Sequence, residues 1–141
     1  MLSNAAKYAI RATLYLAVNS SETKKVGAKK IAEEIKVPLP FLSKSLQQLT
    51  KSHVISSTKG PNGGFFIDEA NGKKSIWDVI SCMDGIEKFN QCFLGLSDCD
   101  NVNPCAVHHL VVGFRNKIMH EFRDKNIHEI SQKDMNSLTK I

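Results

Sequence analysis

The stretch "IAEEIKVPLPFLSKSLQQLTKSHVISSTKGPNGGFFI", residues 31–67, decides the fold of this chain of 141 residues. Its first half predicts two short amphipathic helices, over residues 27–35 and 40–53, because apolar residues recur at helical spacing in both. The prolines of "KVPLP" separate the helices, since each proline disfavours the α conformation of the residue before it. Pro40 suits a first helical turn. Two helices with a tight break between them are typical of a helix-turn-helix.

The second of these helices has two predicted faces. The predicted buried face consists of Phe41, Leu42, Leu46 and Leu49, and the polar face of Ser43, Lys44, Gln47 and Lys51. In helix-turn-helix proteins the second helix enters the major groove of DNA with its N-terminal residues near the base edges. The polar face is therefore the predicted recognition surface.

Two β-prone runs, "VISST" (54–58) and "GFFI" (64–67), flank a Gly- and Pro-containing turn that begins at Lys59. They predict a β-hairpin. A further amphipathic helix is predicted over residues 4–18. Three helices followed by a hairpin make the pattern of a winged helix-turn-helix over residues 1–70. The expected fold class is mainly α with a small β wing (α+β), extended by a long C-terminal dimerisation helix.

Residues 71–125 are expected to form a second part. It comprises a linker helix over residues 73–85, a cysteine loop over 91–108, and a long helix with Asn103 as N-cap and Pro104 in its first turn, ending at Lys125. The apolar stripe of the long helix consists of Val107, Val111, Phe114, Ile118 and Phe122. Such a rod, about 30 Å long, exceeds what a small domain covers, so we expect it to pair with a second copy of the chain. The alternative is a helix folded back on its own core. Residues 126–141 show no strong pattern and are expected to be a tail, flexible in part.

Charge is divided unevenly along the chain. Residues 1–61 carry ten Lys and Arg against three Glu, whereas residues 62–141 carry nine basic and eleven acidic residues. This division favours a module that binds a polyanion, joined to a regulatory or assembly module, with a merely solvated lysine-rich surface as the alternative. No apolar run approaches the ~20 residues of a membrane span, and the N-terminus lacks the pattern of a signal peptide. The prediction is a cytoplasmic protein that does not bind membranes.

The segment "QCFLGLSDCDNVNPCAVHH", residues 91–109, holds three cysteines, with six and then five residues between them. Zinc sites use closer pairs of cysteines, and structural disulfides are rare in the cytoplasm. Thiolates on a long loop can instead hold an iron–sulfur cluster. Cys105 is expected in the first turn of the long helix, where the helix dipole favours a thiolate. Cys82 lies outside this spacing and is expected to be a buried structural cysteine.

The chain resembles the Rrf-two family of winged-helix transcriptional regulators from residue 1 to about residue 130. The motifs that carry the resemblance are "KYAIRATLYLA" (7–17), "IAEEIKVPLPFLSKSLQQL" (31–49), "SSTKGPNGGFFI" (56–67), "SIWDVI" (75–80) and the three cysteines before a long helix. The resemblance implies a homodimer that binds a roughly palindromic operator. It also implies that the cysteine loop and the long helix lie at the dimer interface.

The resemblance further implies the ligands of a cluster. IscR-like members of the family have a histidine three residues after the last cysteine, which gives the expected ligand set Cys92, Cys99, Cys105 and His108. A [2Fe–2S] cluster is expected rather than [4Fe–4S]. Other members use a carboxylate from the first helix of the partner subunit, but residues 1–21 here contain no Asp or Glu. The first gap between cysteines is one residue longer than in IscR-like members, so an oxygen ligand from Asp98 or Asp100 stays open.

The DNA-binding residues follow from the polar face, the glycine-rich turn and the resemblance together. They are Pro38, Pro40, Ser43, Lys44, Gln47, Lys59 and Gly60. Prolines at two of these positions are a departure from the family. Proline cannot donate a hydrogen bond, so these two residues cannot recognise bases in that way. Lys59 is expected to enter the minor groove.

The expected function is a homodimeric DNA-binding repressor whose binding is modulated by an iron–sulfur cluster on a loop that supplies three cysteines and one histidine. A thiol-redox or zinc-dependent regulator without a cluster is the first alternative. An electron-transfer or cluster-carrier protein is a second, but it leaves the wing and the recognition helix unexplained. The chain has no G-x-S-x-G motif, no phosphate loop and no acid pair that the fold would bring together, so an enzyme is not expected.

Overall fold

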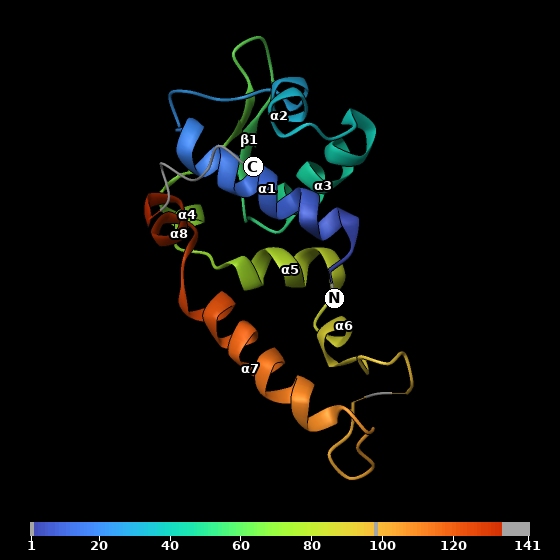
Figure 1. The fold of residues 1–141 in the computed structure, drawn as a ribbon. Helices are drawn as coiled ribbons and strands as arrows, with labels where there is room; N and C mark the ends of the chain where they lie inside the picture. The colour runs from blue at the N-terminus through green and yellow to red at the C-terminus, as the bar shows by residue number, and fades with distance from the viewer. Residues whose placement is uncertain (1, 98, 134–141) are drawn as a thin grey trace.

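The computed structural model describes residues 2–97 and 99–133, which form eight helices and one two-stranded sheet (Figure 1). The elements are α1 Asn4–Asn19, α2 Ala28–Ile35, α3 Leu39–Lys51, β1 Ser56–Thr58, β2 Gly64–Phe66, α4 Glu69–Gly72, α5 Ile76–Asp84, α6 Glu87–Asn90, α7 His108–Asp124 and α8 Ile127–Lys133. The predicted fold class, mainly α with a small β wing, is confirmed.

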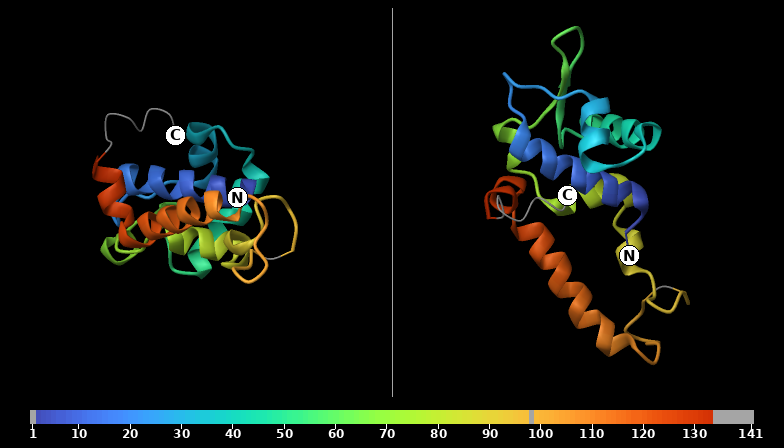
Figure 2. Two further views of the ribbon diagram at one scale, coloured as in Figure 1. Left: turned by 60° about the horizontal axis from the view of Figure 1, so that its bottom comes forward. Right: turned by 45° about the horizontal axis from the view of Figure 1, so that its top comes forward.

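Helix α1 crosses the middle of the molecule, with the helix-turn-helix and wing on one side and α5 on the other (Figures 1 and 2). Ser3 begins the helix, because its hydroxyl accepts a hydrogen bond from the Ala6 N–H. Ala6, Ala9 and Ala12 are fully buried. Their small side chains let α3 and α5 approach α1 closely, so α1 forms the centre of the core.

The helix-turn-helix is made by α2 and α3. Helix α2 ends at Lys36, whose left-handed conformation (φ 54°) turns the chain, and Val37 N–H bonds back to the Ala32 carbonyl at 3.0 Å. Helix α3 begins after Pro38 and buries Leu42, Leu46 and Leu49 completely. Both helices therefore form where the sequence predicts them.

The sequence predicts that Phe41 is buried, and this prediction is wrong. The side chain of Phe41 is 63 % exposed, whereas Leu42 is fully buried. Successive residues of a helix are turned by about 100°, and Leu42, Leu46 and Leu49 already occupy the side that faces the core. Phe41 is consequently left on the surface of the first turn of α3.

The wing is the antiparallel pair β1 and β2, with Ser56 opposite Phe66 and Thr58 opposite Gly64. Phe65 also exchanges two backbone hydrogen bonds with Val26, of 2.8 and 2.9 Å. A Cβ on Gly64 would lie 2.9 Å from the backbone of Val26, so this close approach requires glycine. The predicted hairpin is confirmed and is anchored to the loop before α2.

The long helix is shorter at its start than predicted. Helix α7 begins at His108 rather than near Asn103, and Pro104 lies outside it. The His108 N–H bonds to the carbonyl of Cys105, three residues earlier, at 3.0 Å. Residues 105–107 therefore form a turn. The prediction that Cys105 lies in the first turn of the helix, directly under the influence of its dipole, is wrong.

The region after α7 was expected to be a tail, flexible in part, but its described part is helical. Residues 127–133 form α8, which packs on α1 and α4, and Ile127 is fully buried. The Ile127 N–H bonds to the carbonyl of Lys74 at 2.8 Å, which ties α8 to the start of α5. The rest of the predicted tail, residues 134–141, lies outside the described residues. Across 2–97 and 99–133, we find no helix with the length and apolar character needed to cross a bilayer.

Candidate functional site

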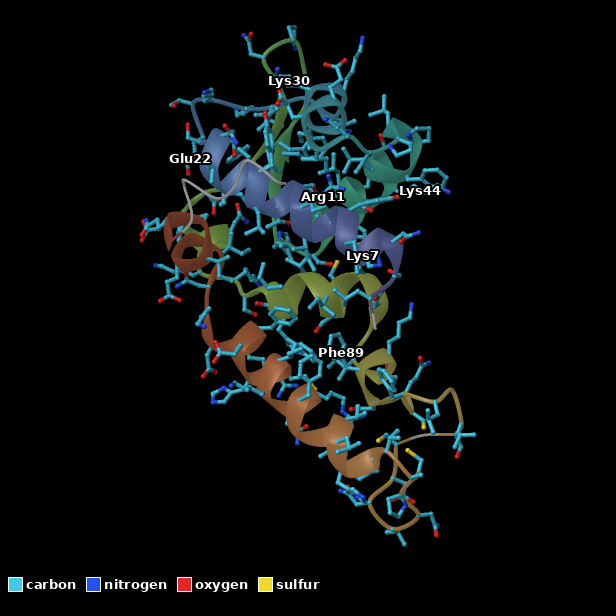
Figure 3. All side chains as sticks on the ribbon, viewed as in Figure 1. Lys7, Arg11, Glu22, Lys30, Lys44 and Phe89 are labelled. Carbon is cyan, nitrogen blue, oxygen red and sulfur yellow. The ribbon has the colours of Figure 1, made fainter. Side chains whose placement is uncertain are left out.

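The predicted DNA-binding residues lie on α3 and on the wing. Pro38, Pro40, Lys44, Gln47, Lys59 and Gly60 are exposed, and Ser43 is half-buried. Lys44 projects from α3 away from the core (Figure 3). Gly60 has φ +101°, a conformation that glycine adopts without strain, and it follows Lys59 in the turn of the wing. Exposure of these residues leaves them available to a ligand.

A groove of about 410 Å³ separates the second half of α3 from the wing. Gln47 and Lys59 line it, together with Thr50, Lys51 and Thr58. Two ammonium groups and the hydroxyls of Ser57 and Thr58 suit the phosphates of a DNA strand, which accept hydrogen bonds and carry negative charge, whereas the Thr50 hydroxyl already donates to the Leu46 carbonyl. The structure thus brings Gln47 and Lys59 to one surface, whereas Pro38 and Pro40 lie at the other end of α3. Lys51 belonged to the predicted polar face, but Thr50 and Thr58 carried no signal in the sequence.

The second candidate site is a pocket of about 210 Å³ in the cysteine loop, at the end of the molecule opposite the wing (Figure 1). All four predicted ligands, Cys92, Cys99, Cys105 and His108, line this pocket, as does Asp100. The backbone of Cys99 is fixed by a 3.1 Å hydrogen bond from its N–H to the Asn90 carbonyl at the end of α6. Asp98 lies outside the described residues. The four predicted ligands are therefore gathered in one place.

Local backbone geometry lowers the pKa of the Cys92 thiol. The Gly95 N–H bonds to the Cys92 carbonyl at 2.9 Å, and Gly95 has φ +73°, so the chain folds back over Cys92 in a tight turn. A hydrogen bond from the Leu94 backbone has the largest effect and lowers this pKa; burial opposes it, and further hydrogen bonds from the Leu96 backbone, the Cys105 side chain and the Gly95 backbone lower it more. A stabilised thiolate is the form of cysteine that binds metals and reacts with oxidants.

His108 is oriented by two contacts. Its Nδ1 lies 3.2 Å from Cys99 Sγ, and its Nε2 lies 2.8 Å from Asn101 Oδ1. An amide oxygen can only accept a hydrogen bond, so Nε2 donates to Asn101 and Nδ1 is the ring nitrogen that faces Cys99. This is the arrangement of a metal-binding histidine with an outer hydrogen-bond partner. Asn101 is a site residue that the sequence did not reveal.

The ligands do not converge on a single point. In the described part of the chain, no group of three or more His, Cys, Asp or Glu side chains is placed to hold one metal ion. Cys82 lies away from this pocket and is half-buried rather than buried, with Sγ 3.2 Å from Ser52 Oγ. The gathered residues can therefore serve as redox thiols, or as ligands of a group larger than one ion.

The predicted dimerisation stripe divides into two parts. Ile118 and Phe122 pack against the chain's own core, whereas Phe114 is 58 % exposed. Val107 and Val111 are half-buried, and Leu110 beside them is 75 % exposed. The first half of α7 extends from the body next to the cysteine loop (Figure 1). The second half of α7 thus folds back on the core, and the first half is left open.

A helix-turn-helix with a β wing, joined through a linker helix to a cysteine pocket, defines a winged-helix transcriptional regulator. The chain belongs to the Rrf2 (Rrf-two) family. The model of this family, described as an iron-dependent transcriptional regulator, matches residues 2–133.

Two relatives agree with this assignment, and a solved structure shares the fold. The chain is 36 % identical over 124 residues to an HTH-type transcriptional regulator of Aquifex aeolicus, covering 86 % of this chain and 85 % of that one. It is 31 % identical over 124 residues to the HTH-type transcriptional regulator IscR of an Enterobacter species, covering 83 % and 75 % of the two chains. Among solved structures, CymR, the global cysteine regulator of B. subtilis, matches with a TM-score of 0.74 at 15 % identity, covering 94 % of this chain and 97 % of that chain.

Proposed function

We propose that this protein is a homodimeric DNA-binding repressor whose operator binding is modulated by an iron–sulfur cluster on the loop before α7. The cluster ligands in this proposal are Cys92, Cys99, Cys105 and His108. The observation that carries it is that these four residues, separated in sequence, line one pocket. The winged helix supplies the DNA-binding surface at the opposite end of the molecule.

The residues of the pocket fit such a cluster. Three thiols and an imidazole form a donor set that iron–sulfur proteins use, and hydrogen bonds to the cysteine sulfurs are one of the features that tune such clusters. The backbone N–H groups around Cys92 supply such hydrogen bonds to its sulfur. Ligands of a cluster are shared between two or more iron atoms, so they need not converge on one point as the ligands of zinc do. When bound, the cluster would supply a centre that can be oxidised or lost. We propose that it is a [2Fe–2S] cluster.

The pocket is connected to the recognition helix through packed side chains. Phe89, in α6 before the loop, is 2 % exposed and lies edge-on to Trp77 of α5, with ring centroids 5.1 Å apart. Helix α5 in turn contacts α3 through a hydrogen bond of 2.8 Å, which Gln48 Nε2 of α3 donates to the Cys82 carbonyl of α5. Ordering of the loop by its ligands would change the position of α5 through Phe89. A change in the position of α5 would then be passed to α3. This route supports coupling between the pocket and DNA binding.

Dimerisation through the first half of α7 is supported by exposed apolar side chains. Leu110 and Phe114 on α7, with Phe93 on the loop, are more than half exposed. The guanidinium atoms Nε and Nη1 of Arg115 are buried but have no hydrogen-bond partner among the described residues. A second copy would cover the apolar surface of Leu110, Phe114 and Phe93.

A thiol-redox regulator is the second candidate. The side chains of Cys92 and Cys105 interact, and the lowered pKa of Cys92 favours its thiolate. Both candidates share the DNA-binding surface and differ only in what occupies the pocket.

Anaerobic purification separates the candidates. Iron, acid-labile sulfide and zinc are measured per chain with the visible spectrum, and operator affinity is measured before and after the cofactor is removed. The cluster proposal expects iron and sulfide in equal amounts and a change in affinity on their removal. Colourless protein that cannot be reconstituted, but changes affinity on reversible thiol oxidation, supports the second candidate. Stoichiometric zinc would instead identify a zinc-dependent regulator.

A further inference from the structure

The start of the recognition helix carries an exposed apolar tip, which we define as Pro38–Phe41. All four residues of this apolar tip are exposed, and Phe41 and Leu39 are 63 % and 39 % exposed. We infer that the apolar tip recognises thymine methyl groups in the major groove of the operator. This inference rests on the proposed DNA binding and deepens it by naming the base chemistry that is recognised.

The composition of the tip excludes the usual side-chain readout. Side chains distinguish bases mainly through hydrogen bonds, and arginine, lysine, asparagine and glutamine are the common donors. Proline, leucine and phenylalanine side chains have no polar atom, so none of the four can make such a bond. The C5 methyl of thymine is the apolar group that base pairs present in the major groove, and phenylalanine is among its recognised partners.

The position of the tip indicates that it meets DNA. The N-terminal residues of the recognition helix are those that approach base edges in helix-turn-helix proteins. Exposed cations flank the tip, with Lys36 before it and Lys44 one turn after it. Cations around an apolar centre match a groove floor of bases bordered by phosphates, whereas a protein interface at its core is depleted of charge.

The core does not require Phe41. The core side of α3 is filled by Leu42, Leu46 and Leu49, each fully buried. Among the described residues of the DNA-binding part, 2–70, one further large apolar residue is as exposed as Leu39. It is Val18, on α1. The surface proposed for dimerisation lies at the opposite end of the molecule, so a second copy bound there does not cover the tip (Figure 1).

The test begins with the full-length protein and a random pool of double-stranded DNA. The retained sequences give the operator, and each thymine of its half-sites is then replaced by deoxyuridine, which removes only the methyl group. We expect one position in each half-site to lose about fourfold in affinity on this replacement, the factor that burial of one methyl group is worth. Replacement in both half-sites should cost about 15-fold if the two contacts add.

Phe41→Ala supplies the second arm of the experiment. The variant should bind the thymine and deoxyuridine operators equally, because the group that senses the methyl is gone. Val18→Ala is the matched control, an exposed apolar residue outside α3, and should keep the full fourfold difference. Thermal unfolding of both variants should match the parent, since neither side chain is buried.

The outcomes are distinct. If no DNA is retained from the pool, the proposed function and the inference both fail. If an operator is found but no deoxyuridine replacement weakens binding, the DNA-binding function stands and the inference is overturned. A methyl effect of unchanged size in Phe41→Ala also overturns it. So does an altered oligomeric state of this variant with unaltered operator binding, which would identify the tip as a protein contact.

Discussion

Cys99 Sγ lies 3.2 Å from Nδ1 of His108, and this contact joins the cysteine loop to the first residue of α7. The imidazole is 8 % exposed and is held on its other side by Asn101. The next residue, His109, is exposed. Two adjacent histidines of the same chain therefore have different environments, and only one of them faces the cysteines.

The first prediction concerns these histidines. His108→Ala should make the cluster more labile or shift its reduction potential, whereas His109→Ala should do little. Asn101→Ala should have an intermediate effect, because loss of an outer partner typically costs about 10–100-fold in metal affinity. The rate of cluster loss in air, followed by the visible spectrum, measures all three variants. Unchanged spectra and stability of His108→Ala would point instead to an oxygen ligand from Asp100 or Asp98.

The second prediction concerns the cysteines. Cys92→Ala, Cys99→Ala and Cys105→Ala should each abolish cluster binding, because each removes a thiolate from the pocket. Cys82→Ala is the matched control and should retain iron and sulfide, since Cys82 contacts Ser52 rather than the pocket. Iron and sulfide analysis after anaerobic purification tests the set. An iron-free Cys82 variant beside an iron-loaded Cys99 variant would show that the ligand assignment is wrong.

The third prediction concerns the wing. Lys59→Ala should flatten the slope of log affinity against log salt by about two units per dimer, one for each lost phosphate contact. Lys59 is exposed in the turn of the wing, and no acidic residue lies within eight positions of it in the sequence. The loss should be larger on the operator than on other DNA if Lys59 enters a narrow A·T-rich minor groove.

Salt titrations on operator and non-specific DNA make this measurement. Lys73→Ala removes a comparable exposed charge, paired with Glu69 outside the helix-turn-helix, and should leave the slope unchanged. Identical slopes for Lys59→Ala and the parent on both DNAs would mean that the wing does not touch DNA.

The fourth prediction concerns assembly. Phe114→Glu should shift the protein from dimer to monomer, because it would bury a carboxylate in an apolar interface. Asn116→Glu places the same charge at another exposed position of α7, about 200° around the helix from Phe114, and should leave the dimer intact. Sedimentation equilibrium over a range of concentrations gives the association constants. A dimer of parental strength in Phe114→Glu would place the interface elsewhere.

Local sequence patterns determined the helices and the hairpin of the DNA-binding part. The spacing of Leu42, Leu46 and Leu49 gives α3 its buried side, and Pro38 directly before the helix and Pro40 in its first turn define where it starts. Glycines at positions 60, 63 and 64 allow the turn of the wing and its approach to Val26. These features depend on residues close together in the chain, so periodicity and turn chemistry are sufficient to predict them.

Contacts between distant segments decided the rest. The sequence could not show that Phe41 is exposed, because its apolar character agrees with either side of α3 and only packing chooses between them. Helix α8 is too short to be stable alone, and forms where Ile127 is buried and its N–H reaches Lys74. The Asn101–His108 contact depends on how an irregular loop closes, for which no residue spacing gives a rule. The sequence determines the chemistry of each side chain. The free energy of packing the whole chain determines which side chains come into contact.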